Sequence, residues 1–195
     1  MKELEIKIPT SWDEVTLRMF DEISAADGNP IDKTVTILQT LTGIDRKTLN
    51  ELPATFLETS GVMEGLSFLQ HEPKKRVPAE KLTLNNKRYS VGLYPQKWTA
   101  AQYLDYTTVL QQGDNKKLAR IIACFCVPEG KKYGEGYDFE QLVDELYDNM
   151  SITLALGYSG FFHLLLTSYE KALSAYTERK KRKSTRRQGN RSKRK

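Results

Sequence analysis

The last seventeen residues set the strongest limit on what this chain can fold into. Eleven of the residues from 179 to 195 are lysine or arginine, and none is acidic or a large apolar residue. A segment of this composition cannot bury enough apolar surface to offset the entropy that a chain loses on becoming ordered. The sequence therefore predicts a single domain over residues 1–178 and a disordered basic tail over residues 179–195.

Charge divides at the same boundary. The chain of 195 residues carries 30 basic and 25 acidic side chains, which gives a formal net charge of +5. Without the eleven basic residues of the tail, the body retains 19 basic and 25 acidic side chains, a net charge of −6. A body of this charge repels phosphate on average. Any contact with a polyanion is therefore predicted to be made by the tail.

Local patterns in the body predict an α+β fold that is mainly α-helical. Residues 4–8 alternate apolar and charged side chains as a half-buried strand does, and residues 82–93 are typical of a β-hairpin that turns at Asn85 and Asn86. A lone hairpin is only marginally stable in water. The N-terminal strand is therefore predicted to join the hairpin in a small antiparallel sheet.

Capping signals divide most of the remaining body into helices. Three pairs of residues have the spacing of a capping box, namely Ser11 with Glu14, Thr99 with Gln102, and Asp138 with Gln141. Asn29 followed by Pro30 starts a further helix, and Asp45 caps a short one. The first helix is thus expected to begin at Trp12. Gly157 is interpreted as a helix breaker, so that the last helix is expected to begin at Ser159.

Apolar spacing predicts which helical side chains are buried. The helix that starts at Pro30 is expected to bury Ile31, Val35, Leu38 and Leu41. The helix that Thr99 caps is expected to bury Ala101, Leu104, Val109 and Leu110.

No set of residues has the pattern of a catalytic, cofactor-binding or metal site. Cys124 and Cys126 could form a zinc site only with His71 and His163, the two histidines of the chain, at non-standard spacing. The cysteines are interpreted as small buried apolar residues in a reducing, intracellular setting. The acidic residues of 138–148 are interpreted as a solvated helix face. The chain also has no apolar run long enough to span a membrane.

The last helix carries more apolar surface than one buried stripe uses. That stripe is predicted to run from Phe162 to Tyr176 at steps of three and four residues. Tyr158, Phe161 and Leu164 lie off the stripe. We therefore predict that these three side chains contact a partner protein.

The basic tail is the second predicted contact surface. It would bind the phosphates of a nucleic acid without stacking on bases, because no aromatic residue follows Tyr176. A solubilising terminus or a localisation signal fits the same composition. With no polyanion present, the tail is expected to rest on the acidic residues of 138–148. The predicted phosphate-binding residues are Arg179, Lys180, Lys181, Arg182, Lys183, Arg186, Arg187, Arg191, Lys193, Arg194 and Lys195.

Four stretches of the chain resemble small accessory and structural proteins of tailed bacteriophages, including tail-assembly chaperones. They are IPTSWDEVTLRMFDEI (8–23), ILQTLTGIDRKTLNELP (37–53), KWTAAQYLDY (97–106) and ITLALGYSGFFHLLL (152–166). The resemblance implies a non-enzymatic protein of virion assembly or structure without a cofactor, in the cytoplasm of the infected host cell or in the virion. Its implied partners are other phage proteins. The alternative is a nucleic-acid-associated protein that binds phosphates through its tail.

Overall fold

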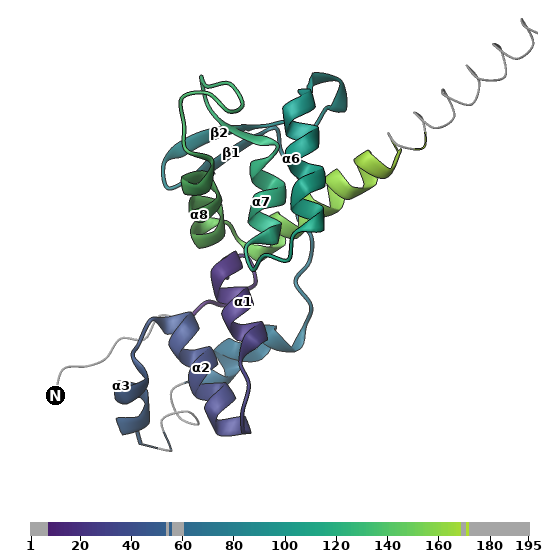
Figure 1. Ribbon diagram of the computed structural model, residues 1–195. Coiled ribbons are helices and arrows are strands. Elements are labelled where there is room, and N and C mark those ends of the chain that lie inside the picture. The colour runs from purple at the N-terminus through teal and green to yellow at the C-terminus, as the bar shows by residue number, and fades with distance from the viewer. Residues whose placement is uncertain (1–7, 54, 56–60, 169–170, 172–195) are drawn as a thin grey trace, which may run out of the picture.

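The computed structural model describes residues 8–53, 55, 61–168 and 171. These residues form two lobes, which are joined by the helix α1 and by residues 71–80, here called the connector (Figure 1). The fold is α+β and mainly helical with a small antiparallel sheet, as predicted. The predicted disordered tail, and all of the predicted N-terminal strand except Ile8, lie outside the described residues.

The first lobe is built from short helices. They are α1 (Leu17–Ala25), α2 (Pro30–Thr42), α3 (Arg46–Glu51), α5 (Val62–Gly65) and the 3-10 helix η1 (Leu66–Gln70). The predicted start of α2 is confirmed, because the Asn29 side chain accepts a hydrogen bond from the Asp32 N–H at 2.9 Å. Asp45 caps α3, also as predicted. The expected burial of Ile31 is wrong: it shares a face with Leu38 but lies in the uncovered first turn, 76% exposed.

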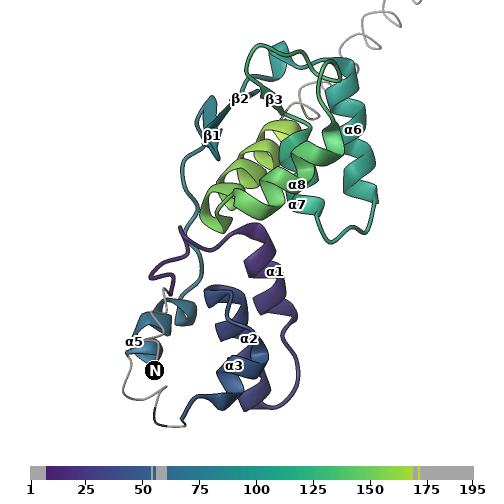
Figure 2. The same cartoon turned by 90° about the vertical axis from the view of Figure 1, so that its left-hand side faces the viewer.

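α1 begins at Leu17, five residues after the predicted start at Trp12. The difference arises because residues 15–17 pair with the second lobe. The N–H of Leu17 donates to the Met150 carbonyl at 3.0 Å, and the N–H of Ile152 donates to the Val15 carbonyl at 2.9 Å. α1 then packs on α2 in the first lobe and on α8 (Phe139–Asn149) in the second, as Figure 2 shows.

The sheet of the second lobe has three antiparallel strands. In spatial order they are β1 (Lys81–Leu84), β2 (Lys87–Val91) and β3 (Cys126–Pro128). The predicted hairpin is confirmed: Asn85 and Asn86 form its turn with φ values of +46° and +61°. The third strand, β3, takes the place of the predicted N-terminal strand beside the hairpin. β3 thus provides the pairing that a lone hairpin lacks.

Helices make up the rest of the second lobe. Besides α8 they are η2 (Pro95–Lys97), α6 (Ala100–Gln111), α7 (Lys117–Ala123) and a final helix described over 152–168, here called the C-terminal helix. The capping box predicted at Thr99 starts α6, and Asp138 caps α8 by accepting from the N–H groups of Glu140 and Gln141. None of the helices in the described ranges combines the length and apolar character needed to cross a bilayer.

The predicted inward face of α6 is only partly right. Val109 is buried as predicted, together with Gln102 and Tyr106, whereas Ala101 is exposed and Leu104 and Leu110 are 61% and 41% exposed. The orientation is fixed by Gln102, whose amide donates to the Cys124 carbonyl at 3.1 Å. A buried hydrogen bond that would be costly to leave unmade therefore decides which side of the helix faces the core.

The C-terminal helix begins at residue 152 and not at Ser159. Gly157 is a buried residue inside this helix, where the connector crosses it. A Cβ atom at position 157 would lie 1.9 Å from the carbonyl oxygen of Arg76. The glycine is thus required by the close approach of two backbones and does not end a helix.

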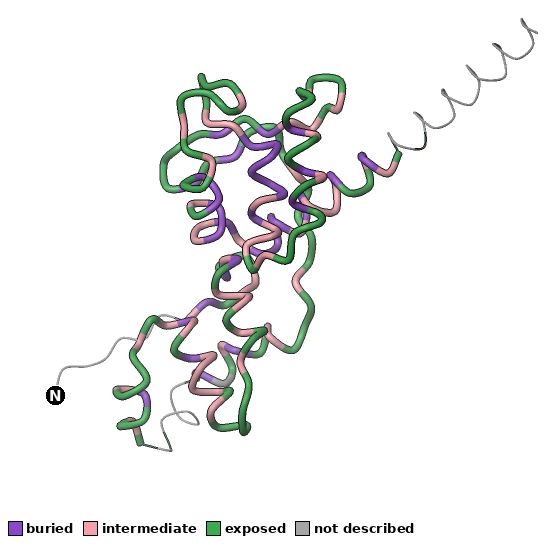
Figure 3. Tube along the Cα trace, in the orientation of Figure 1, coloured by how far each residue is buried: buried purple, intermediate pink, exposed green. Residues whose placement is uncertain are grey.

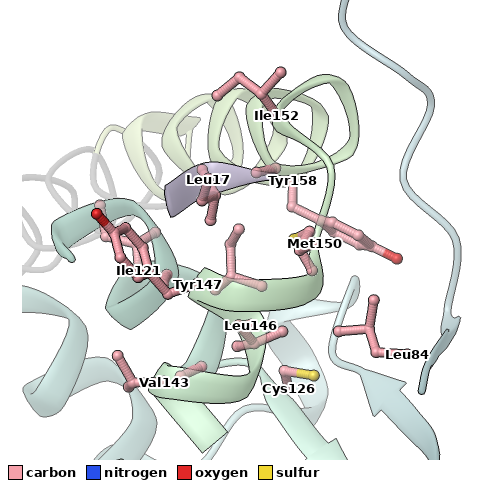
Figure 4. Packing of buried hydrophobic residues seen from close by; sticks show 14 of the residues in the cluster. Leu17, Leu84, Ile121, Cys126, Val143, Leu146, Tyr147, Met150, Ile152 and Tyr158 are labelled. Carbon is pink, nitrogen blue, oxygen red and sulfur yellow. The ribbon is translucent and has the colours of Figure 1, made fainter. Parts of the chain in front are cut away.

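Burial is concentrated in the second lobe (Figure 3). Figure 4 shows side chains from α8 and the C-terminal helix meeting Leu17 of α1. At the centre, the rings of Phe125 and Phe162 lie 4.3 Å apart, which ties the end of α7 to the C-terminal helix. The fully buried residues of the second lobe are Ala119, Ile122, Ala123, Cys124, Phe125, Cys126, Val143, Leu146, Met150, Ala155, Tyr158 and Phe162.

Candidate interaction surfaces

Tyr158, which was predicted to face a partner, lies in the core. Its side chain is fully buried, and its hydroxyl donates to the Ala79 carbonyl of the connector at 2.7 Å. Figure 4 shows it beside Met150. The prediction for Tyr158 is therefore wrong. The connector covers the side of the C-terminal helix on which Tyr158 lies. No local sequence pattern predicts that contact.

Phe161 and Leu164, the other two predicted contact residues, lie at the surface of the C-terminal helix. Leu164 is 70% exposed, and Phe161 is half-buried with its ring edge-on to Phe162 at 5.8 Å. Both line an open hollow of about 740 Å³, here called the Trp98 hollow. Its lining residues are Pro95, Gln96, Trp98, Phe161, Leu164, Leu165 and Ser168.

Trp98 is held in place on two sides. Its indole N–H donates to the Gly92 carbonyl at 2.7 Å, and its ring lies against Phe125 with centroids 4.4 Å apart. One wall of the Trp98 hollow is thus anchored in the core of the second lobe. A preformed apolar surface of this kind costs little ordering entropy when a partner binds.

The chemistry of the Trp98 hollow favours apolar contact. None of its seven lining residues is titratable. The hollow therefore supplies no general acid, general base or charged metal ligand, while Leu164 and Phe161 offer apolar surface that a partner could remove from water.

The acidic face of α8 is engaged within the body. Four of its carboxylates bind cations from other elements: Asp148 binds Arg18, Asp144 binds Lys116, Glu140 binds Arg120, and Glu145 binds Lys87. Arg120 donates two hydrogen bonds to Glu140, of 2.6 and 2.7 Å, and this contact raises the pKa of Arg120. A tail resting on α8 would have to compete with these partners.

Glu145 and Asp148, three residues apart on α8, do not converge on a common site. The Glu145 side chain is 12% exposed and accepts a hydrogen bond from Lys87 on β2 at 2.8 Å. Burial, and secondly the Glu145 carboxylate, raise the pKa of Tyr89 on the same strand. Asp148 instead accepts from the Nε of Arg18 on α1 at 2.6 Å. The two carboxylates stabilise contacts between elements.

The cysteines and histidines give no sign of a reactive group. Cys124 and Cys126 are free and buried, and burial raises the pKa of the Cys124 thiol to about 12. A buried thiol of this kind is unreactive at neutral pH. His71 and His163 are exposed. In the described part of the chain, no three His, Cys, Asp or Glu side chains are grouped so that they could hold a metal ion.

A second open hollow gathers lysines that lie far apart in the sequence. It is lined partly by Trp98, which also lines the Trp98 hollow, and by Tyr94. Its cationic lining consists of Lys81, Lys97, Lys131 and Lys132. We call it the lysine hollow. Because these lysines come from β1, η2 and the loop after β3, no local sequence pattern brings them together.

The eleven predicted phosphate-binding residues, from Arg179 to Lys195, lie outside the described residues. Ser168 is the last residue before the gap at 169–170, and it lines the Trp98 hollow. The end of the continuously described chain thus lies beside the Trp98 hollow.

Comparison of the chain with protein-family models, with curated proteins and with solved structures gave no significant match.

Proposed function

We propose that this chain is a non-enzymatic protein of virion assembly or structure in a tailed bacteriophage, and that it acts by binding other phage proteins at the Trp98 hollow. The observation that supports the proposal is the exposure of Leu164 beside the half-buried Phe161, on a helix whose opposite face is fully buried. The phage setting rests on the four stretches that resemble accessory and structural phage proteins.

The size of the expected contact is set by Leu164. Burying a leucine side chain that is otherwise exposed contributes about 1.5–3 kcal/mol, which corresponds to roughly a tenfold to hundredfold change in affinity. We therefore expect substitutions at Leu164 to weaken partner binding more than substitutions elsewhere on the helical surface.

A pull-down with the full chain tests this proposal. Leu164→Asp should lose the virion proteins that the unmodified chain retains from infected cells, as identified by mass spectrometry. Leu104→Asp on α6 is the matched control, because Leu104 is a comparably exposed helical leucine that does not line the Trp98 hollow. Equal retention by both variants, or absence of the chain from virions and assembly intermediates, would contradict the proposal.

The charge division of the chain favours a second candidate function, binding of nucleic acid through the basic tail. If the tail neutralises about six phosphates, the logarithm of the affinity for duplex DNA should fall with the logarithm of salt concentration at a slope of about −5. The control is a full-length variant in which glutamine replaces the eleven tail cations. Unchanged affinity in this variant would exclude the tail as the binding element.

A further inference from the structure

The lysine hollow gathers lysines that form no ion pair, whereas the arginines of the described body all form one. Every arginine between residues 8 and 168 contacts a carboxylate, as do Lys87 and Lys116. Within the described ranges, none of the four lysines that line the hollow has a carboxylate at ion-pair distance. Four lysines without an ion-pair partner therefore line one open space of about 560 Å³.

Two carboxylates also line the lysine hollow, and they do not cancel its charge. Glu80 accepts a hydrogen bond from the Tyr94 hydroxyl at 2.9 Å, and this contact raises the pKa of Tyr94. Glu135 belongs to the turn that carries Lys132. With four lysines against two glutamates, the hollow has a net charge of +2 on a body whose sequence carries −6.

An exposed aromatic ring lies among these cations. Tyr94 is 45% exposed, and the ammonium group of Lys97 lies 5.0 Å from the centre of its ring. The hydrogen bond to Glu80 fixes the far end of the tyrosine. Aromatic rings set among cations are the pattern by which proteins bind single-stranded nucleic acid, with phosphates on the cations and bases stacked on the rings.

We infer that the lysine hollow binds single-stranded nucleic acid, with phosphates on Lys97, Lys131 and Lys132 and a base stacked on Tyr94. An acidic protein segment would use the cations but would have no use for an exposed ring. This inference goes beyond the proposed protein contact and does not depend on it.

A salt titration of binding to a fluorescent oligothymidylate of about 20 nucleotides tests the inference on the full chain. The variant Lys97→Gln/Lys131→Gln/Lys132→Gln removes three cations of the hollow. Each phosphate contact on a single strand contributes about −0.7 to the salt slope, so the slope should become shallower by about 2. At about 0.1 M salt the affinity should fall by at least about tenfold.

The matched control is Lys33→Gln/Lys47→Gln/Lys74→Gln, which removes the same charge from exposed lysines that do not line the hollow. Its slope should change by less than half as much. Equal changes in the two triple variants would overturn the inference, because net charge alone would then explain binding. The inference would also be overturned if the variant Lys97→Gln/Lys131→Gln/Lys132→Gln lost binding to polyglutamate but bound oligothymidylate as the unmodified chain does. That result would assign the hollow to acidic protein segments.

The stacking part of the inference has its own test. Tyr94→Ala should lower the affinity for oligothymidylate by about tenfold without changing the salt slope, because it removes a ring and not a cation. Tyr94→Phe, which keeps the ring and loses only the hydrogen bond to Glu80, should stay within about twofold of the unmodified chain. Equal affinity of the alanine variant and the unmodified chain would exclude base stacking at Tyr94.

Discussion

The two lobes differ in how completely they bury their apolar side chains. In the second lobe, twelve side chains from α7 to the C-terminal helix are fully buried. In the described part of the first lobe from residue 18 to residue 70, the most buried side chains are Leu38 and Val62, each at 3% exposure. Within the first lobe, α3, α5 and η1 are each six residues or shorter.

This difference indicates unequal stability within one chain. Free energies of local opening follow the density of buried apolar contacts, and loosely packed units open more often than dense ones. We therefore expect the second lobe to act as the rigid support for both hollows. The first lobe is held to it mainly through residues 15–17, α1 and the connector.

The largest effect is expected from a matched pair of phenylalanine truncations. Phe162→Ala removes a fully buried ring that lies 4.3 Å from Phe125, and should lower the free energy of unfolding by about 3–5 kcal/mol. Phe68→Ala removes a half-buried ring of the first lobe, and should cost about 1–2 kcal/mol. Urea denaturation measures both values. Similar losses would show that the lobes are equally well packed.

A matched pair of glycines in the C-terminal helix gives effects of opposite sign. Gly157→Ala places a Cβ against the connector backbone and should destabilise the protein by about 1–3 kcal/mol. Gly160→Ala meets only ordinary contacts with Lys75, and should stabilise the helix by up to about 1 kcal/mol. The measurements are thermal unfolding and amide exchange at Arg76, whose N–H donates to the Thr153 carbonyl at 3.0 Å. Stabilisation by both substitutions would mean that the connector does not pack on the helix.

A pH titration tests the junction between the lobes. Burial, and secondly the Asp21 carboxylate, raise the pKa of Tyr147 to about 12, above the value of about 10 in an unfolded chain. The folded state thus retains this proton more strongly. The contribution of Tyr147 to the free energy of unfolding is fully present below about pH 10, and is lost as the pH rises from about 10 to 12. We expect Tyr147→Phe to reduce the alkaline loss of stability relative to the unmodified chain, as measured by urea denaturation at several pH values.

The smallest effect on stability is expected at the Trp98 hollow. Leu164→Ser removes a side chain that is 70% exposed, and should change the free energy of unfolding by less than about 0.5 kcal/mol. Such a small loss would show that the cost of a substitution in the second lobe depends on how buried the side chain is, and not simply on its position in that lobe. A loss above about 1 kcal/mol, measured by urea denaturation, would show that Leu164 is covered in the free protein.

Sequence reasoning succeeded where the physical signal lies within a few residues. The Thr99 capping box, the Asn29 cap and the Asn85-Asn86 turn each follow from contacts between near neighbours, and all three are present. Local pattern was therefore sufficient for the helices α2 and α6 and for the hairpin.

Sequence reasoning failed where a distant segment decides the outcome. Val15 is not helical because it pairs with Ile152, and Gly157 does not break a helix because it admits the connector. Tyr158 was assigned to the surface because nothing near it in sequence shows that its hydroxyl donates a hydrogen bond to the Ala79 carbonyl. The lysine hollow was missed for the same reason. Of the proposed contact surfaces, Phe161 and Leu164 were found because their exposure follows from helical spacing.

The crossing of the connector at Gly157 also bears on the order in which the protein is completed during synthesis. During synthesis, residues 76 and 79 leave the ribosome long before residues 153, 157 and 158. The backbone of residues 76 and 79 contacts these later residues in the folded protein. Residues 15 and 17 likewise cannot form their backbone hydrogen bonds until residues 150 and 152 have been made. The two lobes therefore become fixed to each other only after residues 150–158 have been made, and a product that stops before residue 150 lacks both sets of contacts.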